Sequence, residues 1–190
     1  MDIVRTQQEE IARLDRHVEV PGPRPDFLVI YDSELEAIRR EVLNYPDSEA
    51  GGMLFGHTTR TGVMTVDLMV RSGGNARHGR LDFRPDLAAD ARIADAVLKR
   101  NALEEIGSWH SHPPHLGPPR PSLGDVQMVG RLWDAIPRCV TSYIMVIARI
   151  ADGDQVEIAP FLFNRHGAAD PPRCLKILAL DGVSPFAGLH

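Results

Sequence analysis

The amino-acid sequence predicts a single α/β domain in which a mixed β-sheet packs against helices. Apolar strand-like segments alternate with helical segments in the order β-α-β-β-α-β-α-β-β, which favours this architecture. The 190 residues suffice for one domain that buries a substantial core. The hydrophobic fraction of 43% and the charged fraction of 25% are typical of soluble globular proteins.

The N-terminal residues 1–25 are expected to form a helical arm and a proline-rich linker, followed by a main domain at residues 26–165 and a tail at residues 166–190. Apolar residues recur at roughly helical spacing at Ile3, Val4, Ile11 and Leu14. The sequence Pro-Gly-Pro-Arg-Pro then ends the helix and stiffens the linker. We expect the arm either to pack on the domain or to bind a partner.

The strands expected in the main domain are apolar or alternating runs bounded by turn residues. They are Phe27 to Tyr31, Glu49 to Thr59, Val63 to Val70, Glu105 to Trp109, Thr141 to Ile150 and Val156 to Phe163. The last two form a hairpin through an Asp-Gly turn, and a short element at Leu175 to Leu180 is expected after them.

Three helices are expected between these strands. The first begins with a capping box of Ser33 and Glu36 and continues through Leu43. The second spans Asp86 to Leu98, and the third has its first turn at Ser122 to Asp125 and ends at Ile136. Residues 71–84 are expected to be a long irregular loop, either solvated or ligand-binding.

Composition excludes several classes of function. The net charge of −5 argues against nonspecific binding of nucleic acid. No apolar run approaches the length of a membrane span, and the charged N-terminus lacks a signal-peptide core. Cys139 and Cys174 are too few for a disulfide framework, which favours a reducing compartment. We therefore expect a cytoplasmic protein.

A metal site is predicted around His110 and His112. Residues two apart on a strand point to the same face, so both imidazoles project together and Ser111 turns away. Ser122 and Asp125 are neighbours on the first turn of a helix. Two imidazoles and one carboxylate form a typical catalytic zinc set that leaves one position for water. Each motif alone has a structural explanation, namely a packed His pair and a capping box.

The combination of motifs resembles the JAMM (MPN+, Mov34/JAB) zinc metalloproteases, whose pattern is an upstream Glu, H-x-H and S-x-x-D. The segment Glu49-Ala50-Gly51-Gly52-Met53-Leu54-Phe55-Gly56 is similar to the E-x-G-G-x-L-x-G strand of that family. The resemblance covers about Phe27 to Phe163 and implies a single MPN/JAB1-like domain with cytidine-deaminase-like architecture. One departure is the spacer from His112 to Ser122, where nine residues replace the usual seven.

The resemblance implies a role for each site residue. His110, His112 and Asp125 would bind Zn²⁺, Glu49 would act as general base and acid, and Ser122 would stabilise the oxyanion. Glu104 shares the predicted strand face of His110 but would lie about 20 Å away along the strand. Substrate-contacting candidates are His115, Gly73, Gly74 and Asn75.

The function implied by the resemblance is cleavage of the amide bond after the C-terminal glycine of a ubiquitin-like protein, by Glu-assisted attack of zinc-activated water. The prokaryotic JAB-type deubiquitinase-like isopeptidases are the most similar class, and E1-like and E2-like conjugation proteins are plausible partners. Alternatives are processing of a sulfur-carrier protein or small molecule, and an inactive MPN scaffold. The sequence contains neither the H-E-x-x-H helix of zincins nor a G-x-S-x-G elbow.

Overall fold

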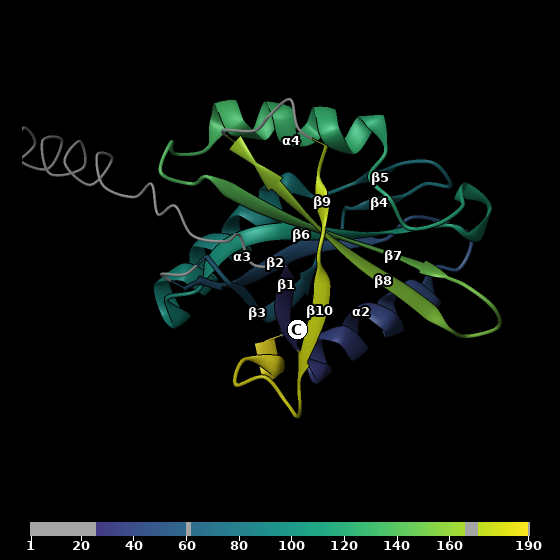
Figure 1. The fold of residues 1–190 in the computed structure, drawn as a ribbon, viewed down its shortest axis with the longest axis horizontal. Coiled ribbons are helices and arrows are strands. Elements are labelled where there is room, and N and C mark those ends of the chain that lie inside the picture. Colours follow the sequence, from purple (N-terminus) through teal and green to yellow (C-terminus); the bar gives the residue numbers. More distant parts are fainter. Residues whose placement is uncertain (1–25, 60–61, 166–170, 190) are drawn as a thin grey trace, which may run out of the picture.

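The computed structural model describes residues 26–59, 62–165 and 171–189 (Figure 1). The predicted helical arm at residues 1–25 lies outside these ranges. None of the described helices has the length and apolar character needed to cross a membrane. The described residues form the mixed sheet with helices that the sequence predicts, with one additional two-stranded sheet.

The main sheet has eight strands in the order β10-β1-β3-β2-β6-β7-β8-β9. Parallel pairs are β1 with β10, β1 with β3 and β6 with β7, and the remaining pairs are antiparallel. The strands are β1 (Phe27–Tyr31), β2 (Gly51–Thr58), β3 (Met64–Arg71), β6 (Glu104–His112), β7 (Ser142–Ile150), β8 (Val156–Asn164), β9 (Arg173–Cys174) and β10 (Lys176–Leu180). The predicted hairpin is therefore confirmed as β7 and β8.

Three α-helices cover the two faces of this sheet (Figure 1). They are α2 (Asp32–Asn44), α3 (Leu87–Asn101) and α4 (Leu123–Ala135). One face of β7, with Ile144 and Val146, belongs to the core under α2, whereas Met145 and Ile147 on its other face pack with α4. Val97 of α3 packs with Phe55 and Leu68 on the face of the sheet opposite α2. The sheet thus lies between α2 on one side and α3 and α4 on the other.

The C-terminal end of α4 is fixed by Arg165. Its guanidinium donates hydrogen bonds to the carbonyl oxygens of Trp133, Ile136, Pro137 and Val140. The same group lies 5.4 Å from the centre of the Trp133 ring. Carbonyls at a helix C-terminus lack partners within the helix and carry partial negative charge, so the half-buried guanidinium of Arg165 satisfies them.

Two sequence predictions about local structure are wrong. Ser33 does not cap α2, because the helix already begins at Asp32 and Tyr31 occupies the capping position. The Ser33 hydroxyl instead accepts a hydrogen bond from the backbone of Ser184 and donates to Glu34. Residues 71–84 are not wholly irregular, because β4 (Arg77–His78) and β5 (Phe83–Arg84) pair as a small antiparallel hairpin.

The C-terminal segment contributes to the main sheet. The short element expected at Leu175 to Leu180 is the strand β10, which pairs in parallel with the whole length of β1, from Phe27 with Lys176 to Tyr31 with Leu180. A 3-10 turn, η3 (Ala187–Leu189), follows it, and another, η1 (Pro114–Leu116), lies after β6.

Candidate metal centre

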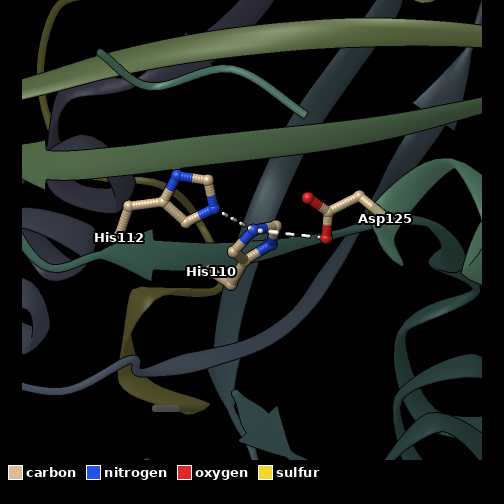
Figure 2. A group of neighbouring side chains, drawn as sticks. All are labelled: His110, His112 and Asp125. Atoms are coloured by element: carbon tan, nitrogen blue, oxygen red, sulfur yellow. Dashed lines mark hydrogen bonds and ion pairs between the residues drawn. The ribbon is translucent and has the colours of Figure 1, made fainter. Parts of the chain in front are cut away.

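Strand β6 places two imidazoles between α3 and α4. It lies between β2 and β7 near the middle of the main sheet. Trp109 packs into the core under α2, so the alternate residues His110 and His112 project to the opposite face, as predicted. Both histidines are buried, and their Nε2 atoms are 3.1 Å apart (Figure 2).

The N-terminus of α4 supplies the third group. Ser122 is the N-cap residue, and its hydroxyl accepts a hydrogen bond from the backbone N–H of Asp125. In return the Asp125 carboxylate accepts hydrogen bonds from the backbone N–H and the hydroxyl of Ser122, both through Oδ2. The predicted capping box is therefore present. It turns Oδ1 of Asp125 toward His110 Nε2, 3.5 Å away (Figure 2).

The three side chains fit a zinc ion. Their donor atoms all lie within 4.8 Å of one another, and they form the metal-capable group found among the described residues. Zinc–nitrogen and zinc–oxygen bonds of about 2.1 Å at tetrahedral angles separate two ligand atoms by about 3.3–3.4 Å. The separations from His110 to His112, 3.1 Å, and from His110 to Asp125, 3.5 Å, are close to that geometry. The donor set also suits zinc, because imidazole and carboxylate are both among its common ligands.

Burial keeps both imidazoles in the form that binds metals. Desolvation lowers the pKa of His110 to about 4, although the nearby Asp125 carboxylate opposes this shift. Desolvation also lowers the pKa of His112, again against the attraction of Asp125. Both rings are therefore neutral at pH 7, which is the charge state in which imidazole binds metal ions.

Glu49 lies two residues before the start of β2, and the backbone that follows it is bound to β6 between the two histidines. The next residue, Ala50, donates its N–H to the Ser111 hydroxyl at 2.9 Å, and the Ser111 N–H donates to the Ala50 carbonyl at 2.7 Å. The side chain of Glu49 is buried, and its pKa is raised to about 7. Desolvation is the main cause, with further contributions from the negative charges of Asp125 and Asp82. A carboxyl group with this pKa can both accept and release a proton near neutral pH.

The β4–β5 hairpin surrounds Glu49 from the other side. The backbone N–H of Glu49 donates to the Gly79 carbonyl at 2.7 Å, and the N–H of Phe83 donates to the Glu49 carboxylate, which partly offsets its raised pKa. The Phe83 ring packs directly on Gly51, where a Cβ atom would lie only 2.8 Å from two ring carbons. The absence of a side chain at Gly51 therefore permits this close packing of the Phe83 ring.

All five predicted metal and catalytic residues line one cavity of about 1010 Å³. These are Glu49, His110, His112, Ser122 and Asp125. Its walls include Leu81 and Phe83 of the hairpin, Leu116 and Pro118 of the loop after β6, and Met128 of α4. A cavity of this size is large enough for a small molecule or the tail of a polypeptide.

The comparison with protein families identifies the family of this chain. Residues 32–159 match the model of the prokaryotic homologues of the JAB domain, and this range contains every residue of the site. The chain belongs to the prokaryotic JAB family. This confirms the resemblance to JAMM/MPN proteins that the motifs indicate.

Relatives of this prokaryotic JAB chain include a probable metalloprotease, y4qB, of Sinorhizobium fredii. The two are 28% identical over 91 residues, which span 47% of this chain and 56% of the relative. The chain thus matches little more than half the length of that protein.

Two solved structures share the JAB-like fold of this chain. A solution structure of protein DSY2949 from Desulfitobacterium hafniense superposes with a TM-score of 0.63 at 18% identity, covering 84% of this chain and 97% of the other. A protein from Salinibacter ruber gives a TM-score of 0.54 at 24% identity, covering 83% and 95%.

The structure places the other predicted site residues outside the lining of this JAB cavity. His115 is exposed on η1, and its neighbour Leu116 lines the cavity. Gly73 donates its N–H to Asp90, and Asn75 donates to Asp86 through its backbone and its side chain. The loop at residues 73–75 is therefore bound to the start of α3. A substrate contact by His115, Gly73, Gly74 or Asn75 stays a prediction.

Sequence reasoning misjudged one carboxylate and missed one structural unit. Glu105 lines the cavity with His110, whereas Glu104 does not. The reason is a shift in the register between β2 and β6. Leu54 pairs with Gly107, but the next residue, Phe55, pairs with Glu105. That bulge reverses the alternation on which the Glu104 prediction depends.

The structural unit that the sequence analysis missed is the β4–β5 hairpin. Its four-residue turn from Gly79 to Asp82 is the one local feature that could have indicated it.

Proposed function

We propose that the protein is a zinc-dependent isopeptidase or peptidase that cleaves the amide bond after the C-terminal glycine of a ubiquitin-like protein. The observation that carries the proposal is the convergence in one cavity of three metal-capable donor atoms, all within 4.8 Å of one another, and a carboxyl group with a raised pKa. The family and the relative named a probable metalloprotease support a hydrolytic function.

His110, His112 and Asp125 would hold the zinc ion, which acts as a Lewis acid and lowers the pKa of water toward about 7. Glu49 would accept the proton of the attacking water and return it to the leaving amine. Its raised pKa suits both steps, because the carboxylate is neither too weak a base nor too weak an acid near neutral pH. The leaving group would then depart as a neutral amine.

Ser122 is the proposed oxyanion donor. Its hydroxyl lies at the N-terminus of α4 and lines the cavity. That hydroxyl donates to Asp125 Oδ2 in the structure, so it would have to turn toward the substrate oxygen during the reaction. A donor aimed at developing negative charge contributes about 3 kcal/mol to catalysis in comparable sites.

An extended tail ending in glycine is the proposed substrate segment. The small sheet contains only β4 and β5, so β5 has no strand partner on its outer side among the described residues. A tail could add to this edge by β-augmentation. Leu81 is 71% exposed and Leu116 40% exposed, although both line the cavity, so an apolar partner surface would bury them. E1-like and E2-like conjugation proteins would supply such conjugates.

Hydrolysis of defined amides tests this proposal. The zinc-loaded protein is incubated with ubiquitin whose C-terminal glycine is amide-linked to aminomethylcoumarin, and with a fusion of a bacterial ubiquitin-like protein ending in Gly-Gly. We expect cleavage immediately after the terminal glycine. The variant Glu49→Ala should keep its zinc and lose turnover, and a chelator should abolish activity reversibly.

Two outcomes would overturn the proposal. Cleavage by Glu49→Ala at the native rate would remove Glu49 from the mechanism. Failure to cleave any amide after a terminal glycine, with zinc bound, would exclude the isopeptidase function. A Gly-Gly-ended sulfur-carrier fusion included in the same assay distinguishes that substrate from a conjugation protein.

A further inference from the structure

The main chain at Glu49 is held by a side chain that the sequence motifs do not include. His78 of β4 places its Nδ1 atom 3.0 Å from the carbonyl oxygen of Glu49. A carbonyl oxygen only accepts hydrogen bonds, so Nδ1 must carry the proton and donate it. The neighbouring residue Gly79 accepts the N–H of the same glutamate. Both polar groups of the Glu49 backbone are therefore bound to β4 and the turn after it.

The His78 ring is itself fixed by aromatic contacts. It stacks on Tyr45, with ring centres 3.9 Å apart and an angle of 8° between the planes. It also contacts Phe83, its cross-strand partner, at 5.5 Å between ring centres. Tyr45 is the C-cap residue of α2, which packs on the main sheet. His78 thus connects the hairpin, α2 and Glu49.

A direct role of His78 in catalysis or metal binding does not explain its position. His78 is not among the residues that line the cavity, and the metal-capable group found in the described part of the chain consists of His110, His112 and Asp125. The Nδ1 atom of His78 is engaged by a backbone oxygen. Its effect on the reaction must therefore pass through the position of Glu49.

We propose that His78, stacked on Tyr45, is a positioning residue that holds the Glu49 carboxylate in its reactive place. The inference depends on the proposed function, in which Glu49 transfers the proton. The loss of this contact would free the Glu49 carbonyl, loosen the hairpin and release the Phe83 N–H from the carboxylate. A displacement of about 1 Å in a catalytic group costs up to about 100-fold in rate.

Two variants separate the hydrogen bond from the ring stack, and a third is the control. His78→Phe keeps an aromatic ring beside Tyr45 but has no donor. His78→Asn has an amide nitrogen at the position of Nδ1 but no ring. His57→Phe is the matched control, because His57 is paired with Asp67 on β3 and does not line the cavity.

Steady-state kinetics on the ubiquitin–aminomethylcoumarin amide give the first readout. We expect His78→Phe to lower kcat by at least about tenfold, with KM and bound zinc unchanged. His78→Asn should recover most of that loss, and His57→Phe should keep the native kcat. In a Glu49→Gln background, His78→Phe should have no further effect, because residues that act as a unit are not additive. An equal loss in both backgrounds would show a merely structural role and overturn the inference.

Amide hydrogen exchange measured by NMR on the metal-free protein gives a second readout that needs no substrate. The N–H groups of Glu49 and Phe83 should be protected in the native protein and in His78→Asn, and should exchange faster in His78→Phe. Amides of β7 and β8 should be unaffected. Unchanged protection in His78→Phe would overturn the inference even if turnover were lost. If the native protein cleaves no amide, the proposed function fails while this measurement still decides whether His78 holds Glu49.

Discussion

The Ser122 hydroxyl lies 2.7 Å from Oδ2 of Asp125, and the other oxygen of the same carboxylate faces His110. Ser122 thereby orients a predicted metal ligand as well as capping α4. We expect Ser122→Ala to weaken zinc binding by about tenfold, as removal of a residue that orients a ligand does. It should also lower the free energy of unfolding of the metal-free protein by about 1 kcal/mol, because the cap is lost.

Competition with a chromophoric chelator measures the zinc affinity, and urea unfolding measures the stability. Ser122→Thr is the matched control, because it retains a hydroxyl at the cap. A Ser122→Ala variant with native zinc affinity would show that the capping hydrogen bonds do not orient Asp125.

Removal of a ligand should have a different effect from removal of the proposed base. His110→Ala and Asp125→Ala should each lose stoichiometric zinc, because only two of the three donor groups remain. Glu49→Gln should bind zinc with near-native stoichiometry. Elemental analysis after dialysis against a weak chelator measures the metal content. Stoichiometric zinc in His110→Ala would place the metal elsewhere.

The raised pKa of Glu49 predicts a pH-dependent stability in the metal-free protein. Between its ordinary value of 4.5 and about 7, the folded state binds this proton more tightly than the unfolded state does. The contribution of Glu49 to the free energy of unfolding must therefore fall as pH rises through that window. Glu49→Gln cannot ionise, so it should become more stable relative to the native protein between pH 5 and pH 8.

Urea unfolding of both proteins in the presence of a chelator checks this expectation. The comparison cancels the opposite effect of the buried His110, whose lowered pKa makes the native state gain stability as pH rises from 4 to 6.5. A stability difference that does not change with pH would contradict the raised pKa of Glu49.

Arg165 should contribute strongly to stability because it satisfies the C-terminal carbonyls of α4. We expect Arg165→Ala to lower the free energy of unfolding by about 2–3 kcal/mol. Arg165→Lys should recover only part, since an ammonium group cannot reproduce the planar set of donors. Arg149, which forms an ion pair with the exposed Glu157, is the matched control, and Arg149→Ala should cost less than about 1 kcal/mol. Equal losses for the two arginines would contradict this role.

The parts of the structure that follow local periodicity could be predicted from the sequence. The two-residue spacing of His110 and His112 predicts that their side chains lie on the same face of the strand. The spacing of Ser122 and Asp125 predicts the capping box at the start of α4. Both patterns express geometry within a few residues of chain, namely the two-residue repeat of a strand and the first turn of a helix. The Asp-Gly turn between β7 and β8 is similarly local.

The features that could not be predicted depend on contacts between distant residues. The β4–β5 hairpin is only two residues long on each side, and its support comes from Tyr45, Glu49 and Gly51. The bulge that brings Glu105 into the cavity is a property of the pairing between β2 and β6, not of either strand alone. The Ser33 hydroxyl donates a hydrogen bond to the adjacent Glu34 and accepts one from the backbone N–H of the distant Ser184, so a tertiary contact replaces the expected cap.

The parallel pairing of β1 with β10 has a consequence for the order in which the protein folds. Among the described strands, β1 is synthesised first and β10 last. The backbone groups of β1 that bond to β10 therefore have no strand partner until the strands between them have been made. During that interval β1 is an exposed edge strand to which another unfolded chain can pair. Shortening the gene before the codon for Lys176 would make that exposure permanent and should yield an aggregating product.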